Sequence, residues 1–437
     1  MGIGMAGRTN GDGGDGGAPP AKWQGVLGCL VVILVGLALV GGLSSCVASE
    51  LGRMPGDSME RVWDAPYDRT AAEYGNRAWL VDGTVVRSRF DAVTGFDAGT
   101  GKRRWEYAVP GRAEICATST AAADSVALIG LMEGGKGCAT VVAIDLKDGR
   151  ELWRTGRRPG NADPKYADDV LATGAGLAVL RDEDEEWNTE PERRTRPVLP
   201  GDQALRAFDL RTGAPRWKAA VPKGCLPREV AVASRQVLAA LSCATEAKLA
   251  AFDPADGRVR WTVPLGARRP VAPDSFLSFL SAEPTVLTVQ EPGDHGVHAW
   301  FAFGPDGRRQ GQIDVRSVEA AVADGKLFTA SGGVVAYDLA SGNEVWSSDR
   351  LYANQSVTAL HVGGGRVTIF TRERRGLDGL HVYDSATGET VDERTFDRDT
   401  DDGNDKITGL YRYKDLYIAA RWGNDWNRRP FSAYRTW

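Results

Sequence analysis

A run of closely spaced carboxylates is the strongest candidate for a metal-binding site in this sequence. Residues 397–405 read Asp-Arg-Asp-Thr-Asp-Asp-Gly-Asn-Asp, and alternating carboxylates offer the hard oxygen ligands that calcium prefers. The candidate ligands are Asp397, Asp399, Asp401 and Asp402. The glycine comes one place late for an EF-hand-like loop, however, and no glutamate closes the site at position twelve. The pattern therefore favours a solvated acidic loop over a calcium site.

Signatures of other chemistries are missing from the sequence. The four histidines, which form no cluster with zinc-ligand spacing, are His295, His298, His361 and His381. The chain contains no Gly-x-Ser-x-Gly elbow and no phosphate-binding loop. We therefore expect ordinary surface or core histidines, and the sequence predicts no catalytic and no cofactor-binding residue.

A short phrase recurs along the chain: an aspartate, a turn ending in glycine, then three residues and a tryptophan. Five copies keep all three anchor residues, and their tryptophans are Trp105, Trp153, Trp217, Trp261 and Trp346. Two later copies, which end at Gly307 and Gly388, keep the turn but lose the tryptophan. Such self-similarity, at a spacing of roughly 35 to 65 residues, indicates a repeat architecture.

Each repeat predicts two β-hairpins. An apolar run before the aspartate and a strand-like run after the glycine form one hairpin around an Asp/Gly turn. A second hairpin signal precedes it, with turns such as Asp82-Gly83 and Asp324-Gly325. Two hairpins make a four-stranded unit, which is the blade of a β-propeller.

The hairpin that precedes each Asp/Gly hairpin occurs eight times and the Asp/Gly hairpin seven times, so one blade lacks its outer strand at the C-terminus. The segment Arg61-Val62-Trp63-Asp64 matches the ends of the outer strands, such as Glu344-Val345-Trp346-Ser347. We infer that this N-terminal strand closes the last blade and removes an open sheet edge. The prediction is an all-β, eight-bladed β-propeller of four-stranded blades, with seven blades as the alternative if one weak copy is an insertion.

Four of the six cysteines fall in equivalent places of two blades, where each pair brackets the first of the two hairpins of its blade. Crossed pairing would join blades that are not neighbours. The predicted disulfides are therefore Cys116–Cys138 and Cys225–Cys243, with free buried thiols as the alternative. Paired cysteines indicate an oxidising compartment. Closing loops of this size stabilises by roughly 3 kcal/mol in the chain-entropy model.

The recurring phrase resembles the tryptophan-docking motif of the pyrroloquinoline quinone (PQQ) repeat superfamily, over about residues 60 to 437. The resemblance implies that Trp105, Trp153, Trp217, Trp261 and Trp346 pack between neighbouring blades, which is a structural role. One branch of the superfamily, the quinoprotein dehydrogenases, carries an adjacent Cys-Cys pair and a calcium-holding cluster of Glu, Asn and Asp. This chain has no adjacent cysteines and no matching cluster. It looks more like the BamB-like branch, which binds proteins, so neither PQQ nor calcium is expected as a cofactor.

An apolar segment near the N-terminus predicts an anchor. Residues 25–43 carry no charge, which meets the length of about 20 residues that a membrane-spanning helix needs, so we expect a single span within residues 23–46. The sequence Leu43-Ser44-Ser45-Cys46 resembles the lipobox of bacterial lipoproteins, so lipidation of Cys46 after signal cleavage is the alternative. Either anchor places the propeller on the extracytoplasmic side of a membrane.

The segments around this anchor complete the predicted organisation. Residues 1–22 are rich in glycine with Asp and Asn, and predict a disordered tail because they cannot bury a core. Residues 47–59 form a linker, and residues 60–437 form the propeller.

A charged insert between Arg181 and Gln203 interrupts the third blade. Its mixed charge predicts a flexible solvated loop. The alternative is a partner-docking loop in which Trp187 is the anchor. The net charge of −5 argues against nucleic acid as a general partner.

Together these features predict a membrane-anchored, extracytoplasmic propeller that is a non-catalytic scaffold for a protein or ligand of the cell envelope. The alternatives are a PQQ-dependent dehydrogenase and an extracellular sensor domain.

Overall fold

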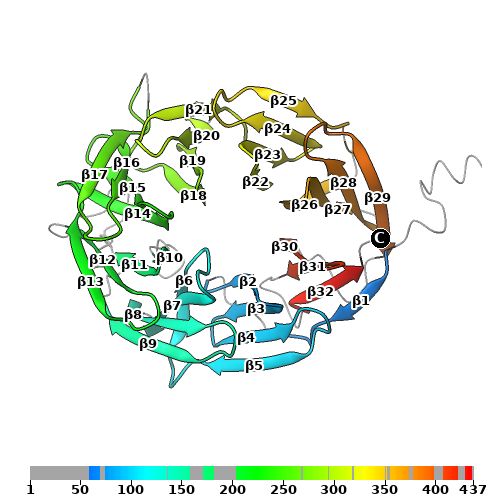
Figure 1. Ribbon diagram of the computed structural model, residues 1–437, viewed down its shortest axis with the longest axis horizontal. Helices are drawn as coiled ribbons and strands as arrows, with labels where there is room; N and C mark the ends of the chain where they lie inside the picture. The colour runs from blue at the N-terminus through cyan, green and yellow to red at the C-terminus, as the bar shows by residue number, and fades with distance from the viewer. Residues whose placement is uncertain are drawn as a thin grey trace, which may run out of the picture. The chain divides into compact units, whose positions relative to one another are not determined.

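The computed structural model of this chain is a ring of β-sheets (Figure 1). It describes residues 59–68, 74–134, 136–157, 171–181, 203–266, 269–293, 295–316, 319–349, 351, 355–373, 377–397, 407–421 and 429–435. The ring belongs to one compact unit, Ser58–Trp437. The described residues form eight four-stranded antiparallel sheets, which confirms the predicted eight-bladed propeller and rules out the seven-blade alternative.

The first four blades follow one another along the chain, from inner to outer strand. Blade 1 contains β2 (Arg77–Val81), β3 (Thr84–Arg89), β4 (Ala92–Asp97) and β5 (Arg103–Ala108). Blade 2 contains β6 (Glu114–Thr118), β7 (Val126–Glu133), β8 (Lys136–Asp145) and β9 (Glu151–Gly156). Blade 3 contains β10 (Leu171–Gly174), β11 (Leu177–Arg181), β12 (Ala204–Asp209) and β13 (Pro215–Ala220). Blade 4 contains β14 (Cys225–Val232), β15 (Val237–Cys243), β16 (Ala247–Phe252) and β17 (Val259–Pro264).

The next three blades repeat this order, and the eighth departs from it. Blade 5 contains β18 (Phe276–Ala282), β19 (Thr285–Gln290), β20 (His298–Phe303) and β21 (Arg309–Ile313). Blade 6 contains β22 (Glu319–Ala323), β23 (Lys326–Ala330), β24 (Val334–Asp338) and β25 (Glu344–Ser347). Blade 7 contains β26 (Gln355–Gly363), β27 (Arg366–Glu373), β28 (Leu377–Asp384) and β29 (Thr390–Asp397). Blade 8 contains β30 (Ile407–Tyr413), β31 (Leu416–Arg421), β32 (Phe431–Arg435) and β1 (Arg61–Asp64).

The N-terminal strand β1 is the outer strand of blade 8, as the sequence predicts. It runs antiparallel to β32, with Trp63 opposite Ala433. The backbone nitrogen of Arg435 donates to the Glu60 oxygen at 2.9 Å, and the Arg435 guanidinium pairs with the Glu60 carboxylate at 2.8 Å. Residues from the two ends of the ring thus complete one sheet, which closes the circle and covers the edge of β32.

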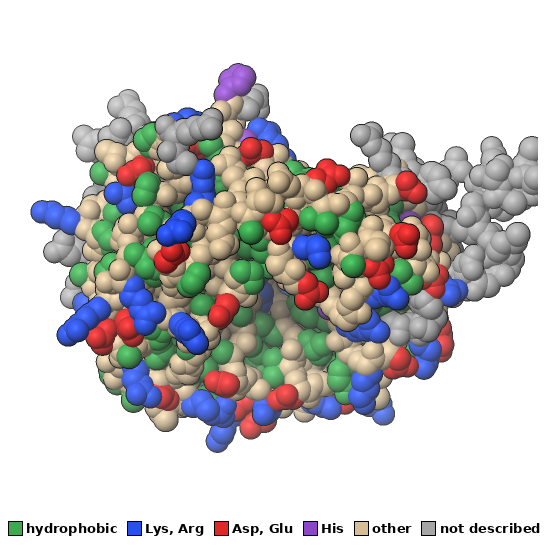
Figure 2. Space-filling model, turned by 45° about the horizontal axis from the view of Figure 1, so that its top comes forward, with side chains coloured by type: hydrophobic (Ala, Val, Ile, Leu, Met, Phe, Trp, Pro, Cys, Tyr) green, Lys and Arg blue, Asp and Glu red, His purple; other side chains and the backbone are tan. Residues whose placement is uncertain are grey.

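Burial follows the position of a strand in its blade. The second strand of blade 4, β15, is buried along its whole length because neighbouring blades cover both of its faces. The outer strand β17 instead alternates exposed and half-buried residues, among them Arg260. Charged side chains on the outer strands protect these edges from pairing with other chains. Figure 2 shows Lys/Arg and Asp/Glu side chains interspersed on the visible face, without a large area of one sign.

Because neighbouring strands run antiparallel, two kinds of connection lie at opposite ends of the blades. The tight turns within the hairpins meet at one end, where the Ala98 nitrogen donates to the Gly83 oxygen at 3.0 Å. The connections between hairpins and between blades leave from the other end, which we call the connection face; there the Val109 nitrogen donates to the Asp91 oxygen. The insert that begins after Arg181 departs from β11 at this face, between the second and third strands of blade 3.

Several predicted segments lie outside the described residues. They are the tail 1–22, the membrane segment 23–46 with Cys46, the linker apart from Met59, and the insert residue Trp187. In the part of the chain that the structure describes, no helix has the length and apolar character to cross a membrane.

Candidate functional site

The tryptophan of each complete repeat lies against the Asp/Gly turn of the next blade. The ring of Trp105 faces Gly149, where any side chain would collide with the indole. Gly149 also has a φ of +76°, a conformation that favours glycine. The same contact joins Trp63 to Gly101, Trp153 to Gly213, Trp217 to Gly257, Trp261 to Gly307 and Trp346 to Gly388. The repeated tryptophans therefore lie at blade junctions, away from the centre of the ring.

Four of these indole N–H groups also bind the neighbouring turn. Trp153 Nε1 donates to the Leu210 oxygen at 2.9 Å, and Trp217 Nε1 donates to the Pro254 oxygen at 2.8 Å. Trp261 and Trp346 make the equivalent bonds to Pro305 and Ser385. The tryptophan fixes both the distance and the orientation of the next blade, because ring contact and hydrogen bond act together.

The aspartate of each phrase organises its own turn. In blade 3, Asp209 Oδ1 accepts from the nitrogen of Thr212 at 3.0 Å, and Oδ2 accepts from Arg216 at 2.6 Å. The bond from Arg216, followed by those from Thr212, lowers the pKa of Asp209 to about 2. Asp145 pairs instead with Arg211 of the next blade at 2.7 Å. These carboxylates are structural.

Blade 5 replaces the tryptophan by Gly311. A side chain at this position would collide with the Leu339 oxygen and the backbone of Gly342, which belong to blade 6. Blades 5 and 6 therefore meet backbone to backbone at this junction.

Both predicted disulfides are present, Cys116–Cys138 and Cys225–Cys243. Cys225 and Cys243 lie directly opposite each other on β14 and β15. Cys116 on β6 reaches Cys138 on β8 across Gly130 of the intervening strand, where a side chain would crowd the Cys138 sulfur. The absence of a side chain at Gly130 thus leaves room for the bridge.

The predicted calcium candidates lie mostly outside the described residues. Asp397 is the last residue of β29, and Asp399, Asp401 and Asp402 lie outside the described residues. His295 and His298 belong to blade 5, whereas His361 and His381 belong to blade 7. Among the residues that the structure describes, no three His, Cys, Asp or Glu side chains group as a metal site.

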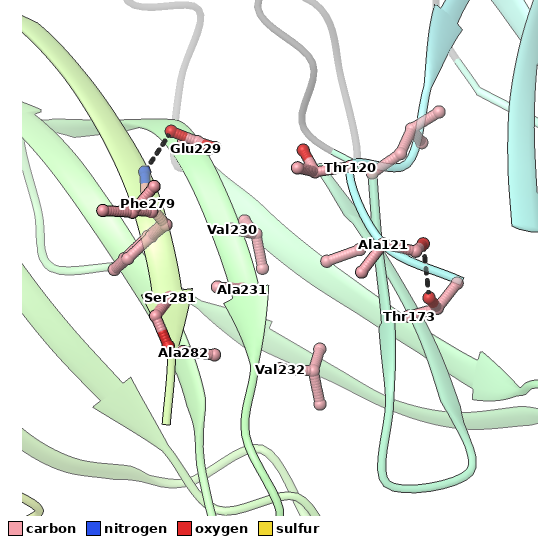
Figure 3. Close-up of a pocket in the computed structure, with 13 residues that line it drawn as sticks. Thr120, Ala121, Thr173, Glu229, Val230, Ala231, Val232, Phe279, Ser281 and Ala282 are labelled. Atoms are coloured by element: carbon pink, nitrogen blue, oxygen red, sulfur yellow. Dashed lines mark hydrogen bonds between the residues drawn. The ribbon is translucent and has the colours of Figure 1, made fainter. Parts of the chain in front are cut away.

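A hollow of about 110 Å³ lies between the inner strands β10, β14 and β18 of blades 3, 4 and 5 (Figure 3). Its walls carry mainly small apolar and hydroxyl side chains, and Glu229 is the charged residue of the lining. Figure 3 shows Glu229 at one end, and Val232 and Ala282 toward the other end. A concave site with an apolar wall and a few polar groups is the usual form of a binding site.

A long connection in blade 2 forms one wall of the hollow. Seven residues, 119–125, join β6 to β7, whereas two residues join β2 to β3 in blade 1. Ala121 is held in place because its oxygen accepts from Ser119 Oγ at 2.8 Å and from Thr173 Oγ1 at 2.9 Å. Thr120 and Ala121 thus reach from blade 2 to the hollow (Figure 3).

Two β-bulges shape the opposite wall. The register of β14 shifts between Pro227 and Glu229, and that of β18 shifts between Phe279 and Ser281. A bulge inserts an extra residue and redirects the side chains around it. The extra residue of β18 is Leu280, which lines the hollow.

Glu229 connects the two bulged strands. Its Oε2 accepts from the backbone nitrogen of Phe279 at 2.8 Å, which joins blade 4 to blade 5 (Figure 3). Among the neighbours on the wall, Val230 and Phe279 are buried, whereas Ala231 and Val232 are partly exposed. The hollow therefore combines a rigid wall with access from solvent.

The residues of the hollow do not fit PQQ. This quinone is a flat tricyclic tricarboxylate, and its size exceeds a space of about 110 Å³. The space suits a small apolar group better than a cofactor of this size.

The sequence alone gives no prediction of this hollow. Two signals were available: the seven residues between the first two strands of blade 2, and a glutamate within the inner strand β14. Neither identifies a hollow alone, because the hollow forms where the connection of blade 2 and the inner strands of blades 3, 4 and 5 meet.

The eight blades, the closing strand and the tryptophan contacts define the chain as a PQQ-repeat β-propeller. The family model described as "Outer membrane protein assembly factor BamB" matches residues 57–181 and 135–295, together more than half of the chain. The chain therefore belongs to this BamB-like family. No curated protein sequence matches it significantly.

Solved structures share the fold at low sequence identity. The computationally designed Ika8 protein is 13% identical, with a TM-score of 0.55 over 86% of this chain and 99% of that chain. Quinohemoprotein alcohol dehydrogenase ADHIIG from Pseudomonas putida HK5 is 10% identical, with a TM-score of 0.52 over 86% of this chain and 75% of that chain. BamB from Moraxella catarrhalis is 15% identical, with a TM-score of 0.48 over 85% and 97% of the two chains. At these identities the first two similarities establish the fold alone.

Proposed function

We propose that this protein is a non-catalytic binding scaffold of the cell envelope, which recognises a protein partner at the centre of its ring. The observation that carries the proposal is the hollow between β10, β14 and β18, with its apolar and hydroxyl lining on rigid strands. Membership of the BamB-like family, whose model is named for an outer membrane assembly factor, supports a role in protein interactions.

We further propose that the N-terminal segment anchors the propeller on the extracytoplasmic side of a membrane. The uncharged run at residues 25–43 supports an anchor, whether a retained helix or a lipidated Cys46. The two disulfides in the ring support an oxidising compartment. Digestion of the propeller by protease added to intact spheroplasts, with the protein retained in the membrane fraction, is the expected result. Full protection from that protease would contradict this orientation.

Site-specific crosslinking tests the binding role. A photoreactive amino acid replaces Ser281 in the lining of the hollow, within the full-length protein in its own cells. The matched control replaces Val345, an exposed residue of outer strand β25. We expect a defined crosslinked partner from position 281 and none from position 345. Crosslinks from position 345 alone would contradict binding at the centre of the ring.

A further inference from the structure

We propose that the two disulfides hold blade 3 in place from both sides, and that the hollow takes its binding shape only when both cysteine pairs are oxidised. The part of this inference that concerns partner binding rests on the proposed function. The part that concerns blade 3 follows from the positions of the two bridges, and it can be measured without a partner.

The disulfide of blade 2 lies on the face that packs against blade 3. The Cys116–Cys138 bridge belongs to one buried cluster with Leu171 and Ala178 of blade 3. The opposite face of blade 2, which carries Ile129, belongs to a separate cluster that blade 2 shares with blade 1. This bridge therefore fixes the surface on which one side of blade 3 rests.

The disulfide of blade 4 lies on the face that packs against blade 3 from the other side. The Cys225–Cys243 bridge shares a buried cluster with Ala172 and Val179 of blade 3. The opposite face of blade 4, which carries Leu238, belongs to a cluster shared with blade 5. Blade 3 thus lies between two neighbouring faces, and each of them is crosslinked.

Blade 3 depends on these neighbours for its own order. Its inner strand β10 has 4 residues, whereas β14 of blade 4 has 8. Its strands β11 and β12 are joined by the long insert between Arg181 and Ala204, and a longer loop costs more conformational entropy to close. Residues 139–224 contain no cysteine, so blade 3 has no crosslink of its own.

The strand between the two bridges is also a wall of the hollow. Leu171 and Ala172 of β10 line the hollow together with Thr173. Successive side chains of a strand point to opposite faces, and accordingly Leu171 packs in the cluster of the blade 2 bridge and Ala172 in that of the blade 4 bridge. Val230, on the other wall, also packs in the cluster of the blade 4 bridge. A displacement of β10 would therefore change the shape of the hollow.

Each bridge forms by thiol–disulfide exchange with an oxidised partner, a protein disulfide. One cysteine thiolate attacks that disulfide, and the second thiolate then displaces the partner's sulfur. The two electrons and the two protons of the cysteine thiols pass to the partner, which leaves as a dithiol. The four cysteines are at most 6% exposed in the folded ring. This oxidation must therefore act before blade 3 packs against its neighbours.

Hydrogen exchange tests the role of the bridges on the full-length protein in detergent micelles. Cys116→Ala/Cys138→Ala and Cys225→Ala/Cys243→Ala each remove one bridge, while the other bridge still supports the ring. We expect the amides of β10 and β11 to exchange at least about tenfold faster in either variant, because a lost crosslink favours local opening. No acceleration in either variant would overturn the proposal.

Strand β22 of blade 6 is the internal control for these measurements. No cysteine follows Cys243 in the sequence, so neither blade 6 nor its two neighbours carry a disulfide. We expect exchange in β22 to change by less than about threefold when either bridge is lost. Equal acceleration in β10 and β22 would mean that the bridges stabilise the ring as a whole, and would overturn the specific role at blade 3.

The unchanged sequence, folded in the presence of dithiothreitol, separates the crosslinks from the packing of the sulfur atoms. This sample keeps all four cysteine side chains but has no bridges, and we expect faster exchange in β10 and β11 than in either variant that lacks one bridge. Exchange as slow as in the oxidised protein would show that packing alone holds blade 3, and would reject the proposal.

Crosslinking in cells separates this inference from the scaffold function. We expect a photoreactive residue at position 281 to capture its partner at least about tenfold less per molecule when all four cysteines are alanine, a ratio that corresponds to about 1.4 kcal/mol. Full capture without the bridges would overturn the dependence of the hollow on oxidation. Faster exchange in β10 of the variants, with no partner captured by the oxidised protein, would support the role of the bridges and reject the scaffold function.

Discussion

At the scale of single residues, a tryptophan and a glycine from neighbouring repeats form one packing unit. The glycine turn presents a flat backbone to the indole, as at Trp153 and Gly213. The aspartate before the glycine holds the turn in shape through its own hydrogen bonds, as Asp209 does. The phrase therefore recurs because each of its residues meets a separate physical requirement of the blade junction.

Two glycines of blade 3 can separate the tryptophan contact from backbone conformation. Gly213 and Gly176 have nearly equal φ values, +70° and +71°. An added Cβ would lie 2.6 Å from Trp153 at Gly213, whereas nothing lies within 4 Å at Gly176. We expect Gly176→Ala to cost about 1 kcal/mol and Gly213→Ala about 1–3 kcal/mol more, as measured by urea unfolding. Equal losses would mean that the indole contact adds nothing to the effect of φ.

His361 predicts a dependence of stability on pH. Burial lowers its pKa, and the charge of Arg412 lowers it further. The folded protein therefore binds a proton at His361 less readily than the unfolded chain does. The resulting contribution of neutral His361 to the free energy of unfolding is complete above about pH 6.5 and declines as the pH falls. His361→Gln should remove a decline of at most about 1.4 kcal/mol per pH unit between pH 7 and 5. Urea unfolding at several pH values tests this, with the exposed His295→Gln as the control.

At the scale of strands, local signals account for what the sequence predicts. The Asp/Gly turn and the tryptophan lie close together in the sequence of one hairpin, so they identify the blades. The closing segment at Arg61–Asp64 and the equivalent cysteines follow from the same repeat. The hollow depends instead on the bulges at Arg228 and Leu280 and on the seating of Ala121 against Thr173. Each bulge lies within one blade, but the bonds from Thr173 to Ala121 and from Phe279 to Glu229 join different blades, and no single repeat specifies these contacts.

At the junction of blades 5 and 6, which lacks a tryptophan, we expect the free energy of unfolding to be unusually sensitive to an added side chain. Gly311→Ala would place a methyl group against the Leu339 oxygen and the Gly342 backbone, which cannot move aside as a flexible side chain can. We expect a loss of about 1–3 kcal/mol in the free energy of unfolding. Gly156→Ala is the matched control, since Gly156 ends outer strand β9 and has nothing within 4 Å. A loss no larger than that of the control would contradict direct backbone contact between blades 5 and 6.

Trp63 comes from the N-terminal strand, yet we expect it to contribute as much to the free energy of unfolding as Trp105, which lies in a contiguous blade. Trp63 of β1 faces Gly101 in the same way that Trp105 of β5 faces Gly149. We expect Trp63→Ala and Trp105→Ala each to cost about 3 kcal/mol, because each removes a large side chain from a blade junction. Thermal unfolding of the two variants compares them. A much smaller effect of Trp63→Ala would show that blade 8 closes without its outer strand.

At the scale of the whole molecule, different parts of the ring have different roles. The blade junctions carry the repeated tryptophans, and the centre carries the hollow of blades 3, 4 and 5. The roots of the insert after Arg181 lie at the connection face, opposite the tight turns. The repeat thus builds a frame whose irregular features, which differ from blade to blade, are available for recognition.

We propose that the protein binds its partner at the centre of the ring through the hollow. The most direct measurement compares crosslinking from a photoreactive residue at position 281 in the full-length protein with and without Ala282→Leu, in intact cells. We expect one defined crosslinked partner whose yield falls about tenfold when leucine fills the hollow, since a tenfold change corresponds to about 1.4 kcal/mol of lost binding. An unchanged yield from the filled variant would contradict it.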